Sequence, residues 1–151
     1  MPAGQLASTL PPYTLRCHIN TLLAQGKAKE VLEFIKKYMV DFYERCRPAV
    51  RSSILSLQFV RHLRASEHLQ AISLVQKSEL KKEPFPSVSE TGKPILCCAE
   101  DLTKLFCKSS LDEGQPECFL ASKRHRDAVI SFVNRELLQY EKAVKDKRSE
   151  P

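Results

Sequence analysis

Residues 55–80 read LSLQFVRHLRASEHLQAISLVQKSEL and carry the clearest structural pattern in the chain. Apolar side chains recur every three or four positions on both sides of Arg64-Ala65-Ser66, which is the spacing of helix faces. Serine is a favoured N-cap residue, which directly precedes the first turn of a helix, so we expect Ser66 to cap the second helix. The pattern predicts a helical hairpin, and it contains no catalytic chemistry.

A second hairpin of the same kind precedes it. A shift of about 40 residues, an offset typical of helical repeats, superimposes apolar positions of the two segments. The pairs are Leu15 with Leu55, Ile19 with Phe59, Leu23 with Leu63, Leu32 with Ile72, and Ile35 with Val75. We therefore expect helices near 13–25, 27–44, 48–64 and 67–78. Because two stacked hairpins leave one apolar face uncovered, the rest of the chain should cap it.

The C-terminal part fits that role. Residues 94–107 predict a fifth helix, and Ser122 can cap a sixth that runs to about 142. Residues 81–94 contain Pro84, Pro86 and Gly92 and are expected to form a loop. The 151 residues thus predict an all-α fold of about six helices, with two antiparallel hairpins and capping helices in one domain over 13–142. Residues 1–12 and 143–151 are expected to be flexible tails.

The charge balance is basic, with 24 Lys and Arg against 18 Asp and Glu and a formal net charge of +6. The basic residues are scattered over the polar sides of helices, without glycine-rich or aromatic tracts, and Trp is absent. The compact cluster Lys123-Arg124-His125-Arg126 could bind an acidic partner or be simply solvated. No apolar run approaches the roughly 20 residues that span a bilayer, and no signal peptide is recognisable, so we expect a cytoplasmic or nuclear protein.

Candidate chemical sites are weak. The six cysteines lack the paired spacing of a zinc site, and without a secretory signal they are expected to be reduced. The four histidines are expected on helix surfaces or core edges, with no nucleophile and orienting carboxylate at useful spacing. Ser52-Ser53 lacks a nucleophile elbow. We therefore expect no catalytic residue, no metal and no cofactor, and hence no enzyme.

Three segments resemble the CTLH/CRA (C-terminal-to-LisH) helical domain. Residues 22–34, LLAQGKAKEVLEF, are similar to its first hairpin, and residues 57–72 are similar to its second. Residues 101–106, DLTKLF, and 116–138 resemble its CRA part. In this order they cover nearly the whole chain, from 15 to 140. Ser66 stands where the second hairpin of the family usually has glycine.

The resemblance implies a function without catalysis. Members of the family include scaffold subunits of the GID/CTLH ubiquitin ligase and Ran-binding-protein-like adaptors. It implies a scaffold or adaptor that joins other helical proteins, CTLH/CRA subunits among them, by apolar and arginine-rich helix faces. The expected partner-binding residues are Phe119, Arg124, Arg126, Asn134 and Leu138. The alternative is a basic helical module that binds nucleic acid or an acidic partner in a nuclear complex, with binding that falls steeply as salt rises.

Overall fold

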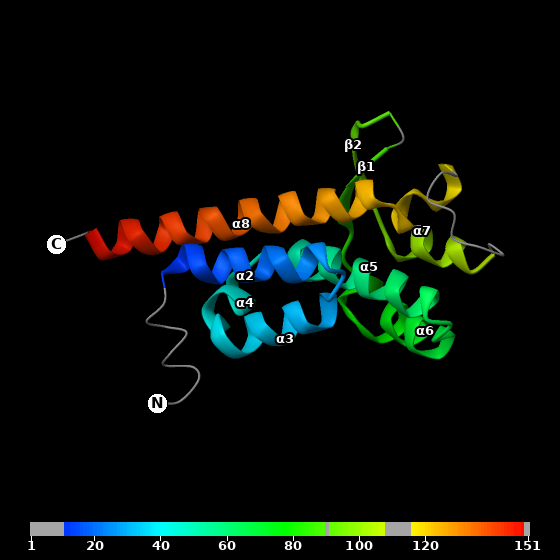
Figure 1. Ribbon diagram of the computed structural model, residues 1–151, viewed down its shortest axis with the longest axis horizontal. Coiled ribbons are helices and arrows are strands. Elements are labelled where there is room, and N and C mark those ends of the chain that lie inside the picture. Colours follow the sequence, from blue (N-terminus) through cyan, green and yellow to red (C-terminus); the bar gives the residue numbers. More distant parts are fainter. Residues whose placement is uncertain (1–10, 90, 108–115, 150–151) are drawn as a thin grey trace.

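The computed structural model describes residues 11–89, 91–107 and 116–149. Within these ranges it contains seven α-helices and one two-stranded sheet, so the expected all-α class is confirmed (Figure 1). The expected tail at 1–12 lies almost entirely outside the described residues. None of the helices in the described part is long and apolar enough to cross a membrane.

The first hairpin consists of α2 (Pro12–Ala24) and α3 (Ala28–Tyr38). Gly26 lies between them with a φ of 73°, in the left-handed region that favours glycine. Its N–H donates to the Leu23 carbonyl at 3.0 Å, and the Lys27 N–H donates to the Leu22 carbonyl at 2.9 Å. These two bonds close the end of α2 and send the chain back as α3.

The second hairpin, α5 (Pro48–Arg64) and α6 (His68–Lys77), repeats this turn. Ser66 has a φ of 59°, its N–H donates to the Leu63 carbonyl at 3.1 Å, and the Glu67 N–H donates to the His62 carbonyl at 2.8 Å. The prediction that Ser66 caps α6 is therefore wrong. Ser66 ends α5, Glu67 occupies the cap position, and no side chain caps α6.

The helix expected over 27–44 is interrupted. It breaks at Met39, whose φ of −133° and ψ of 52° are not helical, and α4 (Val40–Arg45) follows. The change of direction places Phe42 in the core, where its ring lies 5.4 Å from that of Tyr140.

The expected loop at 81–94 and the expected helix from 94 are both wrong. After the 3-10 helix η1 (Glu79–Lys81), strands β1 (Phe85–Val88) and β2 (Pro94–Cys97) form an antiparallel hairpin. Phe85 and Ser87 alternate toward the core, and tertiary burial of these two side chains outweighs the loop character of the prolines. Only α7 (Ala99–Thr103) and the 3-10 helix η2 (Lys104–Cys107) are helical in the rest of that segment.

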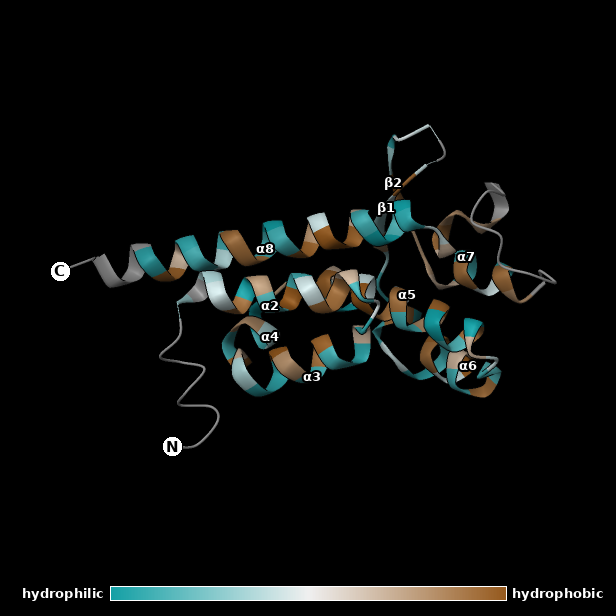
Figure 2. Cartoon of the chain, viewed as in Figure 1, coloured by the Kyte–Doolittle hydropathy of each residue, from teal (hydrophilic) through white to brown (hydrophobic). Residues whose placement is uncertain are grey.

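The C-terminal helix α8 (Lys123–Ser149) follows the 3-10 helix η3 (Pro116–Ala121) and has 27 residues. The His125 N–H donates to the Ser122 hydroxyl at 3.4 Å, which confirms Ser122 as its cap. The helix passes 142 and continues to Ser149, so a tail from 143 is wrong for 143–149. Hydrophobic and hydrophilic residues alternate along α8, which lies beside α2 (Figure 2).

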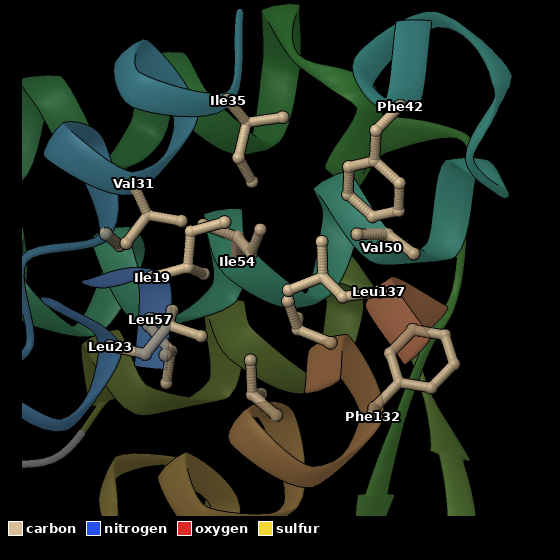
Figure 3. Close-up of a cluster of buried hydrophobic side chains, with 13 residues drawn as sticks. Ile19, Leu23, Val31, Ile35, Phe42, Val50, Ile54, Leu57, Phe132 and Leu137 are labelled. Carbon is tan, nitrogen blue, oxygen red and sulfur yellow. The ribbon is translucent and has the colours of Figure 1, made fainter. Parts of the chain in front are cut away.

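Two apolar clusters make the core. The first joins the first hairpin, α4, the start of α5 and α8 (Figure 3); its members are Ile19, Leu23, Ala28, Val31, Ile35, Phe42, Val50, Ile54, Leu57, Val129, Phe132, Val133 and Leu137. The second joins the end of α5 with α6, the sheet, α7 and η3; its members are Phe59, Val60, Leu63, Ala71, Leu80, Phe85, Cys97, Leu102, Leu105, Leu120 and Ala121. The C-terminal third therefore covers both hairpins.

Candidate functional site

His125 is the most chemically distinctive buried group, and it lies in the core rather than at its edge. Its Nε2 is 2.8 Å from the Ser56 hydroxyl and its Nδ1 is 2.8 Å from the Ser87 hydroxyl. Ser56 donates its own hydrogen to the Ser53 carbonyl. It follows that His125 donates from Nε2 to Ser56, and Ser87 donates to Nδ1.

This network is structural. Burial lowers the pKa of His125 to about 4, so the ring is neutral at physiological pH. The side chains of His125 and Ser56 are fully buried and Ser87 is 4% exposed, so the imidazole ring is closed off from the surface. The three side chains connect α8, α5 and β1 by satisfied hydrogen bonds.

Cys97 is a poor candidate for a reactive centre. All those that the structure describes with side chains are free, and burial raises the pKa of the Cys97 thiol to about 11. A thiol with such a pKa is protonated at neutral pH and is a poor nucleophile. Among residues 11–89, 91–107 and 116–149, no cluster of three or more His, Cys, Asp or Glu is arranged to hold a metal ion.

A groove of about 710 Å³ runs between α8, the two strands and the start of α5. We call it the α8–hairpin groove; it is lined by Arg47, Ala49, Pro86, Ser87, Val88, Gly92, Pro94, Leu96, Arg124, Asp127, Ala128, Ser131, Phe132 and Arg135. Three arginines and one aspartate give its walls a positive balance. The lining residues of α8 span about 16 Å, or three turns, at 1.5 Å per residue.

Two arginines of this groove differ in how they are held. Arg47 pairs with Glu136, and its guanidinium lies 5.3 Å from the ring centre of Phe132. Arg135 is exposed, and it makes no ion pair with any residue that the structure describes. Arg47 is therefore a fixed wall of the groove, whereas Arg135 is available to a ligand.

Exposed apolar side chains adjoin the groove. Leu96 on β2 lines it and is 69% exposed. Leu138 lies three residues after Arg135, on the same face of α8, and is 43% exposed. Exposed leucines thus lie at the groove and farther along the same face of α8.

A smaller pocket of about 260 Å³ lies on the other side of α8. Its lining residues, which include three arginines, are Gln25, Gly26, Leu57, Val60, Arg61, Arg64, Leu120, Ala121, Ser122 and Arg126. We call it the arginine pocket.

The five expected partner-binding residues do not form one surface. Arg124 and Leu138 lie on the face of the α8–hairpin groove, whereas Arg126 lines the arginine pocket. Asn134 is half-buried and accepts a hydrogen bond from Asn20 Nδ2 at 3.0 Å. Phe119 is half-buried and packs against the second apolar cluster.

Three groove residues were missed at the sequence level: Arg47, Leu96 and Arg135. Leu96 was assigned to a helix, although residues 87–96, SVSETGKPIL, place a Thr-Gly turn between two short apolar segments, which is a hairpin signal. Arg47 and Arg135 carry no signal of their own, because only the fold brings them together.

No protein-family model, curated protein or solved structure matches this chain. The similarity to the CTLH/CRA domain therefore stays a prediction from the sequence motifs.

Proposed function

We propose that this chain is a non-catalytic interaction module that joins helical proteins, with the α8–hairpin groove as its contact surface. The observation that supports this best is the groove itself. Its walls combine exposed Leu96 with three arginines, and exposed Leu138 follows on the same face of α8. Protein interfaces are enriched in arginine and have an apolar centre with a polar rim.

The shape of the groove favours a helical partner. Three turns of α8 form one wall, and a helix laid along them can place its own i, i+3, i+4 and i+7 side chains into the space. Asp127 lies among the arginines, so a partner helix of mixed charge fits better than a uniformly acidic one. The sequence motifs suggest that the partner is itself a CTLH/CRA-type subunit, such as those of the ligase scaffolds.

Nucleic acid is the less favoured partner. Phe132 is the aromatic side chain of the groove, and Arg47 covers its ring, so it offers no platform for stacking a base. The basic residues also lie on both sides of α8 rather than in one stripe.

Site-specific cross-linking tests the proposal. A photo-reactive residue at Ser131, in the groove, and one at Gln76, exposed on α6, would be compared in cells by mass spectrometry of the adducts. We expect a helical protein on Ser131 and not on Gln76, and Leu96→Asp should abolish that adduct. Leu69→Asp is the matched control, because Leu69 is an exposed leucine on α6.

Two results would contradict the proposal. Adducts with nucleic acid at Ser131 would favour the alternative function. Loss of the partner in Leu69→Asp but not in Leu96→Asp would move the contact to α6. Recovery of a CTLH/CRA-type protein in the Ser131 adduct would instead support the proposed class of partner.

A further inference from the structure

The arginine pocket is separate from the groove proposed above. Arg126 lines the pocket and Arg124 lines the groove. Their side chains point to different sides of α8, because residues two positions apart in a helix are separated by about 200° around its axis. The pocket is built from the turn of the first hairpin, the end of α5, η3 and the start of α8. A ligand here would touch both hairpins without entering the groove.

The guanidinium groups are positioned by the backbone. Arg61 donates to the Gly26 carbonyl at 3.2 Å and lies 3.5 Å from Glu30, and Arg64 donates to the Ala121 carbonyl at 2.8 Å. Arg126 is half-buried, and no acidic side chain of the described residues pairs with it.

The electrostatic balance of the pocket is positive. Among the residues that the structure describes, no aspartate or glutamate lines it, and Glu30 offsets part of the charge of Arg61 from outside. Ser122 caps α8 at the edge of the pocket, and the N-terminal end of a long helix carries partial positive charge. The pocket is therefore suited to a ligand that carries more than one negative charge.

Part of the remaining lining is apolar. Leu57, Val60 and Leu120 are almost fully buried, and their remaining exposed surface faces this space. The volume of about 260 Å³ lies just below the roughly 300–1,000 Å³ usual for complete small ligands. It matches one apolar side chain with its flanking backbone better than a whole cofactor.

We propose that the arginine pocket binds a short acidic peptide segment of a partner protein, in which one apolar side chain enters the pocket and flanking carboxylates pair with Arg126 and Arg61. A carboxylate meets a guanidinium through two parallel hydrogen bonds, which fixes its orientation. Nucleic acid fits less well, because the lining has no aromatic side chain for a base and a phosphate backbone has nothing to fill an apolar floor.

Peptide display on the purified full chain tests this proposal. A random peptide library is selected on the wild-type protein, and the recovered peptides are synthesised with a fluorescent label. We expect enrichment of aspartate and glutamate around one leucine, isoleucine or phenylalanine. Affinity should fall about tenfold or more in Arg126→Glu, because each lost charge-assisted contact becomes a repulsion. It should also weaken as salt rises.

The controls use variants with matched charge. Lys36→Glu makes the same charge change at an exposed position of α3, outside both the pocket and the groove, and should leave peptide affinity within about twofold of wild type. Arg126→Lys should bind with an intermediate affinity. Glutamate is favourable near a helix N-terminus, so Arg126→Glu should fold, which circular dichroism checks.

Three outcomes would overturn the proposal. The selected peptides could lack acidic enrichment, or Arg126→Glu and Lys36→Glu could weaken binding equally, which would show that only net charge matters. Displacement of the peptide by a single-stranded oligonucleotide as efficiently as by unlabelled peptide would identify nucleic acid as the ligand. The groove proposal is unaffected by these results, because it is tested at Ser131 and Leu96.

Discussion

Ser66 and Gly26 occupy the same position in the two hairpins and share the left-handed backbone, with φ values of 59° and 73°. Each ends the first helix of its hairpin with the same pair of N–H to carbonyl bonds. The second hairpin therefore has the same turn as the first, although serine disfavours the left-handed conformation that the turn requires.

Ser66→Gly should stabilise the protein. The left-handed conformation costs a residue with a Cβ roughly 1–2 kcal/mol, part of which is offset by the greater freedom of glycine in the unfolded chain. Among the described residues the Ser66 side chain makes no hydrogen bond that would be lost; the contact from His68 is to its backbone carbonyl, which glycine keeps. We expect the free energy of unfolding to rise by about 0.5–1 kcal/mol in chemical denaturation.

The reverse change is the control. A Cβ at Gly26 would meet no atom within 4 Å, so Gly26→Ser adds only backbone strain. It should lower the free energy of unfolding by about 1 kcal/mol. If Ser66→Gly and Gly26→Ser changed the free energy of unfolding in the same direction by the same amount, the two hairpins would not share this turn.

Acid should destabilise the fold through His125. Its pKa falls from 6.5 to about 4 on folding, so the unfolded chain binds a proton between these values and the folded protein does not. Stability is therefore lost as pH falls through 6.5 toward 4, by on the order of 3 kcal/mol. Denaturation at a series of pH values would measure this loss.

His125→Gln isolates this contribution. Glutamine offers one donor and one acceptor to Ser56 and Ser87 and does not titrate. It should be less stable than wild type at pH 7 because of poorer packing, and it should lose less stability on acidification. If acid destabilised both proteins equally, the carboxylates and not His125 would be responsible.

Arg51 should resist replacement by lysine. Its guanidinium donates to the Tyr43 carbonyl at 2.7 Å, pairs with Glu79 at 2.7 Å and lies 5.1 Å from the Tyr43 ring centre. A lysine cannot make these contacts together, so Arg51→Lys should cost about 1–2 kcal/mol of unfolding free energy. Arg45→Lys is the control: its exposed pair with Asp41 should change stability by less than about 0.5 kcal/mol. Similar losses in both variants would mean that the Arg51 contacts add nothing.

Asn134 and Leu138 should separate stability from binding. Asn134→Ala removes the acceptor of the half-buried Asn20 amide and should cost about 1 kcal/mol without weakening the partner. Leu138→Asp should change stability by less than about 0.5 kcal/mol and reduce partner recovery. Denaturation would measure the stability of both variants, and affinity purification would measure how much partner each recovers. Loss of partner recovery in Asn134→Ala but not in Leu138→Asp would place Asn134 in the interface.

Much of the helical architecture could be predicted from sequence because the apolar periodicity is local. The hairpin turns, Pro48 at the start of α5 and the Ser122 cap are determined by neighbouring residues. The strands were missed because Phe85 and Ser87 are held by side chains far away in the sequence, His125 among them. The role of Ser66 was missed because serine is a favoured N-cap, whereas its backbone adopts the left-handed conformation of the equivalent Gly26 in the first hairpin.

The binding surfaces were less predictable for the same reason. Arg124 and Arg126 are two positions apart in a basic cluster, yet their side chains lie on opposite sides of α8. Only their packing neighbours decide which belongs to a groove and which to a pocket.

The position of α8 has a consequence for synthesis of the protein. Arg16 of α2 pairs with Glu141 of α8 at 3.0 Å across 125 residues of sequence, and Ile19 and Leu23 lie in the same cluster as Leu137. A ribosome adds roughly 5–20 residues per second, and about 100 residues separate the end of α3 from Glu141, so α8 is absent for about 5–20 s after the first hairpin is made. The apolar face that α8 covers is exposed during that interval, and the fold is completed only after α8 has been synthesised.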